Sequence, residues 1–154
     1  QIPSMVVSFH GDPLMDWKYK TDPELFACKG FPEHRCNWPR GKVLGGCSVI
    51  HGMMYMRGHP EDYDNWARAG NTGWSYNEVL PFFLRSENNT EIGTLVDKKY
   101  HGTEGPMTTN RFPHTPPLAF DILKAAQELK YPVSDDLNGD KYSGFSVAQS
   151  NTRY

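Results

Sequence analysis

The clearest hydrophobic pattern along the chain predicts a helix over residues 117–130. Leu118, Ile122, Ala126 and Leu129 recur at intervals of three and four residues, which places them on one face of a helix. Two prolines open the segment and another follows it, so the helix has a natural start and cannot continue much further. Apolar residues in this arrangement are typical of a helix that packs on a core, so we expect this face to be buried.

Capping residues predict two further helices in the middle of the chain. Pro60 suits the first helical position and Gly70 lies just past the end, so we expect a helix over residues 60–69. The sequence Ser75-Tyr-Asn-Glu78 is a capping box and predicts a second helix that runs to about residue 86.

Short runs between turn residues predict three strands, at residues 17–21, 107–109 and 145–149. Residues 1–40 otherwise show no periodic pattern. Residues 88–113 are predicted to be a long surface excursion, and His101 within it is expected to be a loop residue. A mixture of helices and separated strands of this kind is typical of the α+β class, which we predict for this chain.

Glycines cluster in the run from Arg40 to Gly58, which also carries the candidate chemistry. Gly41, Gly45 and Gly46 precede residues 51–57, which we predict to be a short helix. A Gly-Gly pair permits positive φ and a close approach of the backbone to a ligand, because no Cβ intervenes. The N–H groups of a helix start would add donors for an anion or an electron-rich ring edge. The run fits neither a P-loop nor the G-x-G-x-x-G fingerprint, so it predicts another kind of main-chain ligand site.

Residues 41–64 resemble the first signature of the glucose-methanol-choline (GMC) oxidoreductases, a family of FAD-dependent alcohol oxidases and dehydrogenases. That signature expects a small, a basic and an aliphatic residue before Gly-Gly. Two small residues, an aliphatic residue and Asn or His follow, and then an aromatic, a small and a polar residue. The matching residues are Gly41, Lys42, Leu44, Gly45, Gly46, Cys47, Ser48, Ile50, His51, Tyr55, Gly58 and Asp64. Cys47 departs mildly from the usual Gly, Ser or Thr, but it is small enough to fit.

The resemblance continues along essentially the whole chain. Further stretches follow in the family's order, namely Asp16–Lys20, Arg35–Arg40, Asp62–Trp66, Gly73–Tyr76, Tyr100–Gly102, Asp136–Gly139 and Gly144–Gln149. The pattern is most like the insect FAD- and quinone-dependent glucose dehydrogenases of this family. On this resemblance, residues 1–154 are an internal fragment of the FAD-binding region with part of the substrate domain and no clean internal boundary. The family's N-terminal βαβ unit and its catalytic histidine are expected to lie outside the fragment.

The resemblance implies that this fragment contributes to cofactor binding. FAD is expected to be bound without a covalent link, because the position at which some members tether it through histidine is Ile50 here. The residues expected to contact FAD are Val43, Gly45, Gly46, Cys47, His51, Gly52, Met53 and Met54. His51 is expected to face the flavin ring without acting as the base. No catalytic residue is expected in the fragment, which should be inactive alone.

For the whole enzyme, the resemblance implies oxidation of the CH–OH group of an alcohol or a sugar by hydride transfer to flavin. A quinone or oxygen would accept the electrons. Two alternatives remain open: a secreted binding or structural protein that retains the fold without catalysis, and a flavin-bound lyase acting on cyanohydrins.

Charge and hydropathy exclude two classes of partner. The net charge is −2, from 16 basic and 18 acidic residues without runs of like charge, so we expect no nucleic-acid partner. No apolar stretch approaches the ~20 residues needed to cross a bilayer, so we expect no membrane span.

The chain has three cysteines, and two of them indicate the cellular compartment of the protein. Cys28 and Cys36 flank a turn-rich segment that can bring its ends together, which predicts a disulfide. Two free thiols, or a metal site that uses His34, are the alternatives, and we assign no metal ligands. A disulfide would imply an oxidising compartment, and the glycosylation sequon at Asn88 is compatible with secretion, so we expect an extracellular protein. Cys47 is expected to fill space as a small buried residue.

Overall fold

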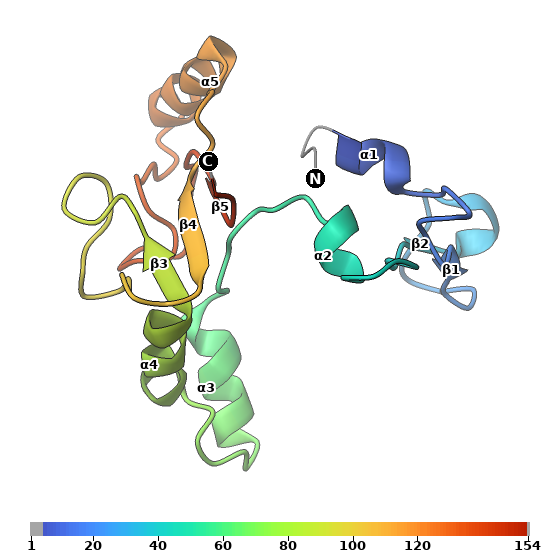
Figure 1. Cartoon of the computed structure of the whole chain (residues 1–154), viewed down its shortest axis with the longest axis horizontal. Helices are drawn as coiled ribbons and strands as arrows, with labels where there is room; N and C mark the ends of the chain where they lie inside the picture. The colour runs from blue at the N-terminus through green and yellow to red at the C-terminus, as the bar shows by residue number, and fades with distance from the viewer. Residues whose placement is uncertain (1–4, 154) are drawn as a thin grey trace. The chain divides into compact units, whose positions relative to one another are not determined.

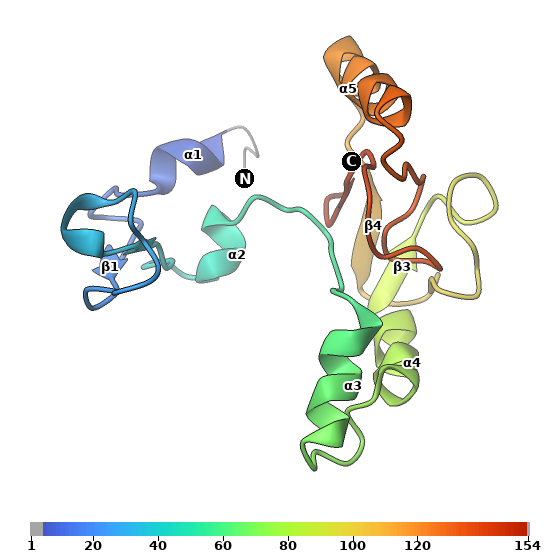
Figure 2. The same ribbon diagram turned by 180° about the vertical axis from the view of Figure 1, so that it is seen from behind.

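The computed structural model describes residues 5–153, which form two compact units, one ending at Met53 and one beginning at Met54 (Figures 1 and 2). Both helices and strands are present, which confirms the predicted α+β class. The elements in chain order are α1 (Val6–Phe9), β1 (Tyr19–Lys20), the 3₁₀ turn η2 (Pro32–His34), β2 (Asn37–Trp38), α2 (Cys47–Ile50), α3 (Pro60–Arg68), α4 (Tyr76–Ser86), β3 (Glu87–Asn89), β4 (Met107–Arg111), α5 (Pro117–Glu128) and β5 (Gln149–Ser150).

Regular structure in the first unit is short, and a disulfide cross-links part of it. β1 and β2 pair antiparallel, with Tyr19 opposite Trp38, which confirms the centre of the strand predicted at residues 17–21. The helix α1 lies in a region where the sequence predicted no regular element. A disulfide joins Cys28 to Cys36, so the predicted bridge is confirmed over the thiol and metal alternatives.

In the second unit, α3 and α4 begin and end where the capping residues predict. The His59 side chain caps α3 by accepting a backbone N–H of its first turn at 3.1 Å, and Gly70, at φ +99°, follows its end. The capping box Ser75–Glu78 opens α4. The two helices contact each other through aromatic rings, among them Tyr63 and Phe83, whose centroids are 5.7 Å apart.

The second unit is built on a three-stranded sheet in the order β3–β4–β5 (Figure 1). β3 and β4 are parallel, with Asn88 opposite Thr108. β4 and β5 are antiparallel, with Asn110 opposite Ser150. Met54 forms an isolated antiparallel bridge with Ser150, so the chain enters this unit beside its last strand.

The strand predictions for the second unit are confirmed only in part. The strand predicted at residues 107–109 is confirmed as part of β4. The surface excursion predicted at residues 88–113 is wrong, because β3 and β4 form the sheet within it and His101 is buried. The strand predicted at residues 145–149 is displaced to β5, because Phe145 instead bridges a residue that follows α5.

The helix predicted at residues 117–130 is confirmed as α5, but the predicted burial of its apolar face is wrong. Ala126 is buried, whereas Leu118, Ile122 and Leu129 are 65%, 50% and 71% exposed. The segment that approaches α5 is the irregular run 145–148, which covers only part of the helix. Periodicity identifies an apolar face, but it does not show what packs against that face.

The interior of the second unit is organised around a buried carboxylate. Glu87, the first residue of β3, has no solvent exposure. Its carboxylate accepts hydrogen bonds from Arg57 and, at 3.0 Å, from the Asn89 amide. Nδ1 of His101 lies 3.0 Å from Glu87 Oε1, and Nε2 lies 2.8 Å from Asp136 Oδ2. We call Arg57, Glu87, His101 and Asp136 the buried ionic network.

Each charge in this network is stabilised by a neighbour of opposite charge. Burial alone would lower the pKa of His101, but its hydrogen bonds to Asp136 and Glu87 outweigh burial and raise that pKa. Burial would likewise raise the pKa of Glu87, but His101 and Arg57 outweigh it and lower that pKa. Both ring nitrogens of His101 face carboxylate oxygens, so the protonated ring satisfies both of them.

Removal of the disulfide should destabilise the first unit by on the order of 2–3 kcal/mol, the chain-entropy value for so short a loop. The two cysteines are eight positions apart. The double variant Cys28→Ala/Cys36→Ala of the full-length protein would be compared with wild type by denaturant unfolding. Wild type treated with a phosphine reductant should lose the same stability, and the variant should not respond to reductant. Equal stability of the variant and oxidised wild type would contradict this expectation.

The buried ionic network should make the second unit most stable in weakly acidic solution. The contribution of Glu87 is fully present above its usual pKa of 4.5 and is lost as the pH falls through its lowered folded-state pKa. The contribution of His101 is fully present below its usual pKa of 6.5 and is lost as the pH rises through its raised folded-state pKa. Hydrogen exchange of the β3 and β4 amides, followed across pH, should therefore be slowest, relative to intrinsic rates, between these two values.

A substitution can assign the alkaline part of this profile to His101. His101→Gln should lower the stability at pH 6 by roughly 1.5–3 kcal/mol, the range for a hydrogen bond to a charged group. It should also remove the alkaline decline, because glutamine does not titrate. Asp135→Asn is a matched control, since this carboxylate pairs with Arg111 but is 75% exposed. An alkaline decline that persists unchanged in H101Q would show that another group causes it.

Candidate cofactor site

The predicted cofactor residues from Val43 to Met53 lie in one continuous part of the first unit, which we call the glycine segment. Its first four residues form a tight turn, in which the Gly46 N–H donates to the Val43 carbonyl at 2.8 Å. Gly45 and Gly46 have φ of +94° and +59°, in the region that favours glycine. The turn expected from the glycine pair is therefore present, while its contact with a cofactor stays a prediction.

Two glycines of this run are required for different reasons. A Cβ at Gly41 would lie 2.2 Å from the carbonyl oxygen of Gly46, so the incoming chain packs directly on the turn. A Cβ at Gly46 would meet no described atom within 4 Å. The backbone of Gly46, with φ 59° and ψ −137°, nevertheless strains any other residue. Gly46 thus presents bare main chain to open space.

The helix of the glycine segment precedes His51, so the prediction of a helix at residues 51–57 is wrong. α2 spans Cys47–Ile50, and His51 is already extended, with φ −84° and ψ 161°. Nδ1 of His51 accepts the Met53 N–H at 2.8 Å, and Met53 has φ +60°. This turn stops the helix, and the following residues are irregular or extended, in spite of a methionine-rich composition that favours helix.

Two side chains hold the glycine segment in place. Asp16 is buried and accepts backbone hydrogen bonds at 2.8–2.9 Å from Lys18, Gly11 and Arg40. These N–H groups, that of Lys18 foremost, lower the pKa of Asp16. At the other end of the segment, His10 Nε2 donates to the Ile50 carbonyl at 2.8 Å. The Arg40 and Ile50 contacts join residues 24 and 40 positions apart, so no local pattern in the sequence pointed to them.

The remaining predicted contacts differ in exposure and location. Cys47 is a free, exposed thiol at the start of α2, so the expectation of a small buried residue is wrong. Gly52 is exposed and Met53 is half-buried. Met54, 66% exposed, belongs to the second unit. The structure thus brings Val43 to Met53 together within the first unit, and Met54 lies in the other unit.

The residues of the glycine segment fit a planar cofactor that is held mainly by main chain. An added Cβ at either Gly46 or Gly52 would meet no described atom within 4 Å, so a ring system can approach the backbone at both positions. His51 and the exposed thiol of Cys47 lie between these glycines and supply polar side chains. FAD, with its planar ring and polar edges, is compatible with this arrangement.

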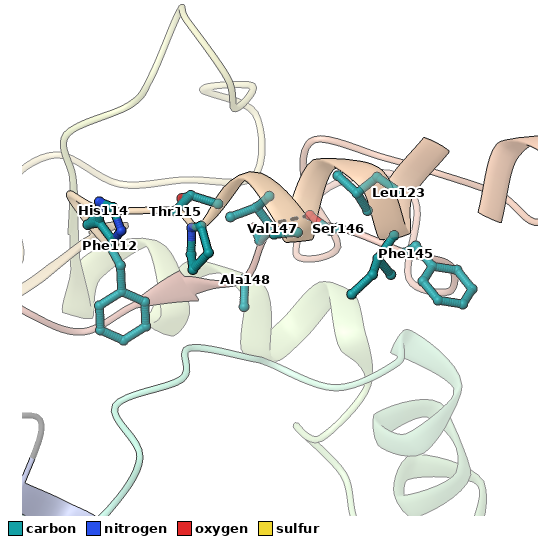
Figure 3. Close-up of a pocket in the computed structure, with 11 residues that line it drawn as sticks. Phe112, His114, Thr115, Leu123, Phe145, Ser146, Val147 and Ala148 are labelled. Atoms are coloured by element: carbon teal, nitrogen blue, oxygen red, sulfur yellow. Dashed lines mark hydrogen bonds between the residues drawn. The ribbon is translucent and has the colours of Figure 1, made fainter. Parts of the chain in front are cut away.

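A groove in the second unit lies between α5 and residues 145–148 (Figure 3). Its wall includes Phe112, Leu123, Phe145, Val147 and Ala148, with the two phenylalanine rings at opposite ends of the view. Among the described residues that line the groove, His114 is the single ionisable side chain. The groove can bury an apolar surface, but it offers no acid–base pair for chemistry.

Clusters of metal ligands and membrane-spanning helices are absent from residues 5–153. This part of the chain contains no group of three or more His, Cys, Asp or Glu side chains arranged to hold a metal ion. None of its helices combines the length and the apolar character needed to cross a bilayer.

Known proteins provide an independent comparison. Over 153 residues, the chain is 52% identical to glucose dehydrogenase (FAD, quinone) of Drosophila melanogaster. The aligned region covers 99% of this chain and 24% of that protein. It is 37% identical over 144 residues to mitochondrial choline dehydrogenase of Mus musculus, covering 94% of this chain and 23% of that protein. The crystal structure of pyridoxine 4-oxidase from Mesorbium loti matches with a TM-score of 0.82 at 30% identity, over 98% of this chain and 28% of that one.

These matches also show how much of its relatives' length the chain spans. It spans about a quarter of the length of the curated relatives that it matches. Residues 19–154 match the sequence model described as GMC oxidoreductase, which includes the glycine segment. The chain therefore belongs to the GMC oxidoreductase family.

Proposed function

We propose that this chain is part of an FAD-dependent oxidoreductase that oxidises the CH–OH group of an alcohol or a sugar. The observation that carries the proposal is the glycine segment, which presents bare main chain at Gly46 and Gly52 within the region that matches the family. The Drosophila relative, 52% identical, is named a glucose dehydrogenase that uses FAD and quinone. A sugar is therefore the preferred substrate class, and a quinone or oxygen the electron acceptor.

In this proposal, the described residues bind and orient the cofactor and leave proton transfer to other parts of the enzyme. When bound, FAD supplies the acceptor for the hydride that leaves the alcohol carbon. Gly45 and Gly46 allow the backbone close approach, and the disposition of the turn is fixed by Asp16 and His10 at its two flanks. No side chain of the glycine segment is assigned as the general base.

Substrate and acceptor can be tested together on the full-length enzyme. Reduction of the flavin absorbance would be followed by stopped flow after mixing with glucose, with choline or with a simple primary alcohol. Reoxidation would then be followed with a soluble quinone or with oxygen. If none of these compounds reduces the flavin, the proposed activity is contradicted. Faster reoxidation by the quinone would indicate a dehydrogenase, and faster reoxidation by oxygen would indicate an oxidase.

We also propose an extracellular location for the enzyme. The disulfide between Cys28 and Cys36 supports it, because such bridges persist in oxidising compartments. The sequon residue Asn88 gives less support, since it is half-buried in β3. Cell fractionation followed by peptide mapping without reductant tests both points, and enzyme found only inside cells with free Cys28 and Cys36 thiols would contradict the proposal.

Substitution of Gly46 by a larger residue should weaken FAD binding, because the new side chain would occupy the open space next to the Gly46 backbone. Gly46→Val places a branched side chain where the cofactor is proposed to lie, so the dissociation constant for FAD should rise at least about tenfold, which corresponds to ~1.4 kcal/mol. FAD content after gel filtration and titration of the apoprotein provide the measurement.

A matched control separates this effect from backbone strain. Gly93 lies in the second unit, has φ +81°, and a Cβ there would also meet no described atom within 4 Å. Gly93→Val should therefore lower stability by a similar amount, on the order of 1–3 kcal/mol, and leave FAD affinity within about threefold of wild type. If both variants bind FAD equally well, the glycine segment is a structural turn and the site assignment is wrong.

A further inference from the structure

His51 makes a hydrogen bond that fixes both the state of its own ring and the path of the chain. Its Nδ1 lies 2.8 Å from the backbone nitrogen of Met53. A backbone N–H can only donate, so Nδ1 is the acceptor and carries no proton. The ring is therefore neutral, with its proton on Nε2.

This bond coincides with an unusual backbone conformation. Met53 has φ +60°, in the left-handed region that is unfavourable for a residue with a Cβ. Asn and Asp stabilise turns of this kind when their side-chain oxygen accepts the N–H two residues on. Nδ1 of His51 occupies the same place as the Oδ1 of Asn, since each atom is bonded to Cγ.

We infer that His51 is a positioning residue, whose Nδ1 holds the turn from His51 to Met53 and so sets the main chain that contacts the flavin. The inference rests on the proposed function of the glycine segment. The turn places Gly52 where its backbone is exposed and a Cβ would meet no described atom within 4 Å. His51 thereby acts through the backbone, by an acceptor atom next to Cγ, and its Nε2–H is dispensable for FAD binding.

Three substitutions separate the acceptor at Nδ1 from the proton at Nε2. His51→Asn keeps an acceptor bonded to Cγ and removes the atom at the Nε2 position. His51→Gln places its amide near the Nε2 position and removes the acceptor from Cγ. His51→Leu removes both. Each variant would be made in the full-length enzyme, prepared as apoprotein and titrated with FAD.

The expected order of affinities follows from the acceptor alone. H51N should bind FAD within about twofold of wild type, while H51Q and H51L should bind about tenfold more weakly, the factor for one net hydrogen bond. Wild-type affinity in H51Q together with weak binding in H51N would overturn the inference in favour of a direct contact through Nε2. Equal affinities in all three variants, whether retained or weakened, would overturn it as well.

Hydrogen exchange of the Met53 amide gives a readout that does not depend on FAD. In the apoproteins, wild type and H51N should protect this amide, and H51Q and H51L should exchange it at least about fivefold faster. An unprotected Met53 amide in wild-type apoprotein would overturn the inference even if the enzyme uses FAD. Wild-type protein that binds no FAD would instead refute the proposed function, and the exchange rates would still decide whether Nδ1 holds the turn.

Discussion

The fold of the second unit depends on the burial of one carboxylate, that of Glu87. A charge without solvent exposure is tolerated only where hydrogen-bond donors and opposite charges surround it. Arg57, Asn89 and His101 supply them from three parts of the chain, and the Gly102 N–H adds a weaker contact at 3.3 Å. Removal of Arg57 or His101 would leave the buried carboxylate without an opposite charge, and removal of Asn89 would leave it with one donor fewer, so the network ties β3 to distant parts of the unit.

The same principle organises the first unit on a smaller scale. Asp16 gathers three backbone N–H groups, and the disulfide ties the loop between β1 and β2. Buried apolar side chains are few in the described chain, namely Ile50, Tyr55, Tyr76, Val96 and Ala126. This agrees with the modest content of hydrophobic residues, 38% of the chain. Directional bonds therefore carry much of the specificity of both units.

Sequence reasoning succeeded where structure is encoded by residues close together in the chain. The caps of α3 and α4, the prolines that open α5, the Gly45–Gly46 turn and the Cys28–Cys36 bridge are all local features. It failed where distant residues decide. Burial of His101 requires Glu87 and Asp136, which lie 14 and 35 positions away. The limits of α2 likewise depend on a turn made by a histidine ring nitrogen, for which propensity scales have no term.

If the proposed cofactor site is built mainly from main chain, only some positions of the glycine segment need a particular residue type. Backbone contacts do not depend on the identity of a side chain that points away, and the side chain of Leu44 is fully exposed in this structure. Gly41 and Gly46 are fixed by close approach and by backbone conformation, and position 51 is fixed by the need for an acceptor next to Cγ. Under the proposed function, the choice of alcohol or sugar is assigned to side chains outside this segment, because a cradle of peptide groups would recognise the flavin and not the substrate.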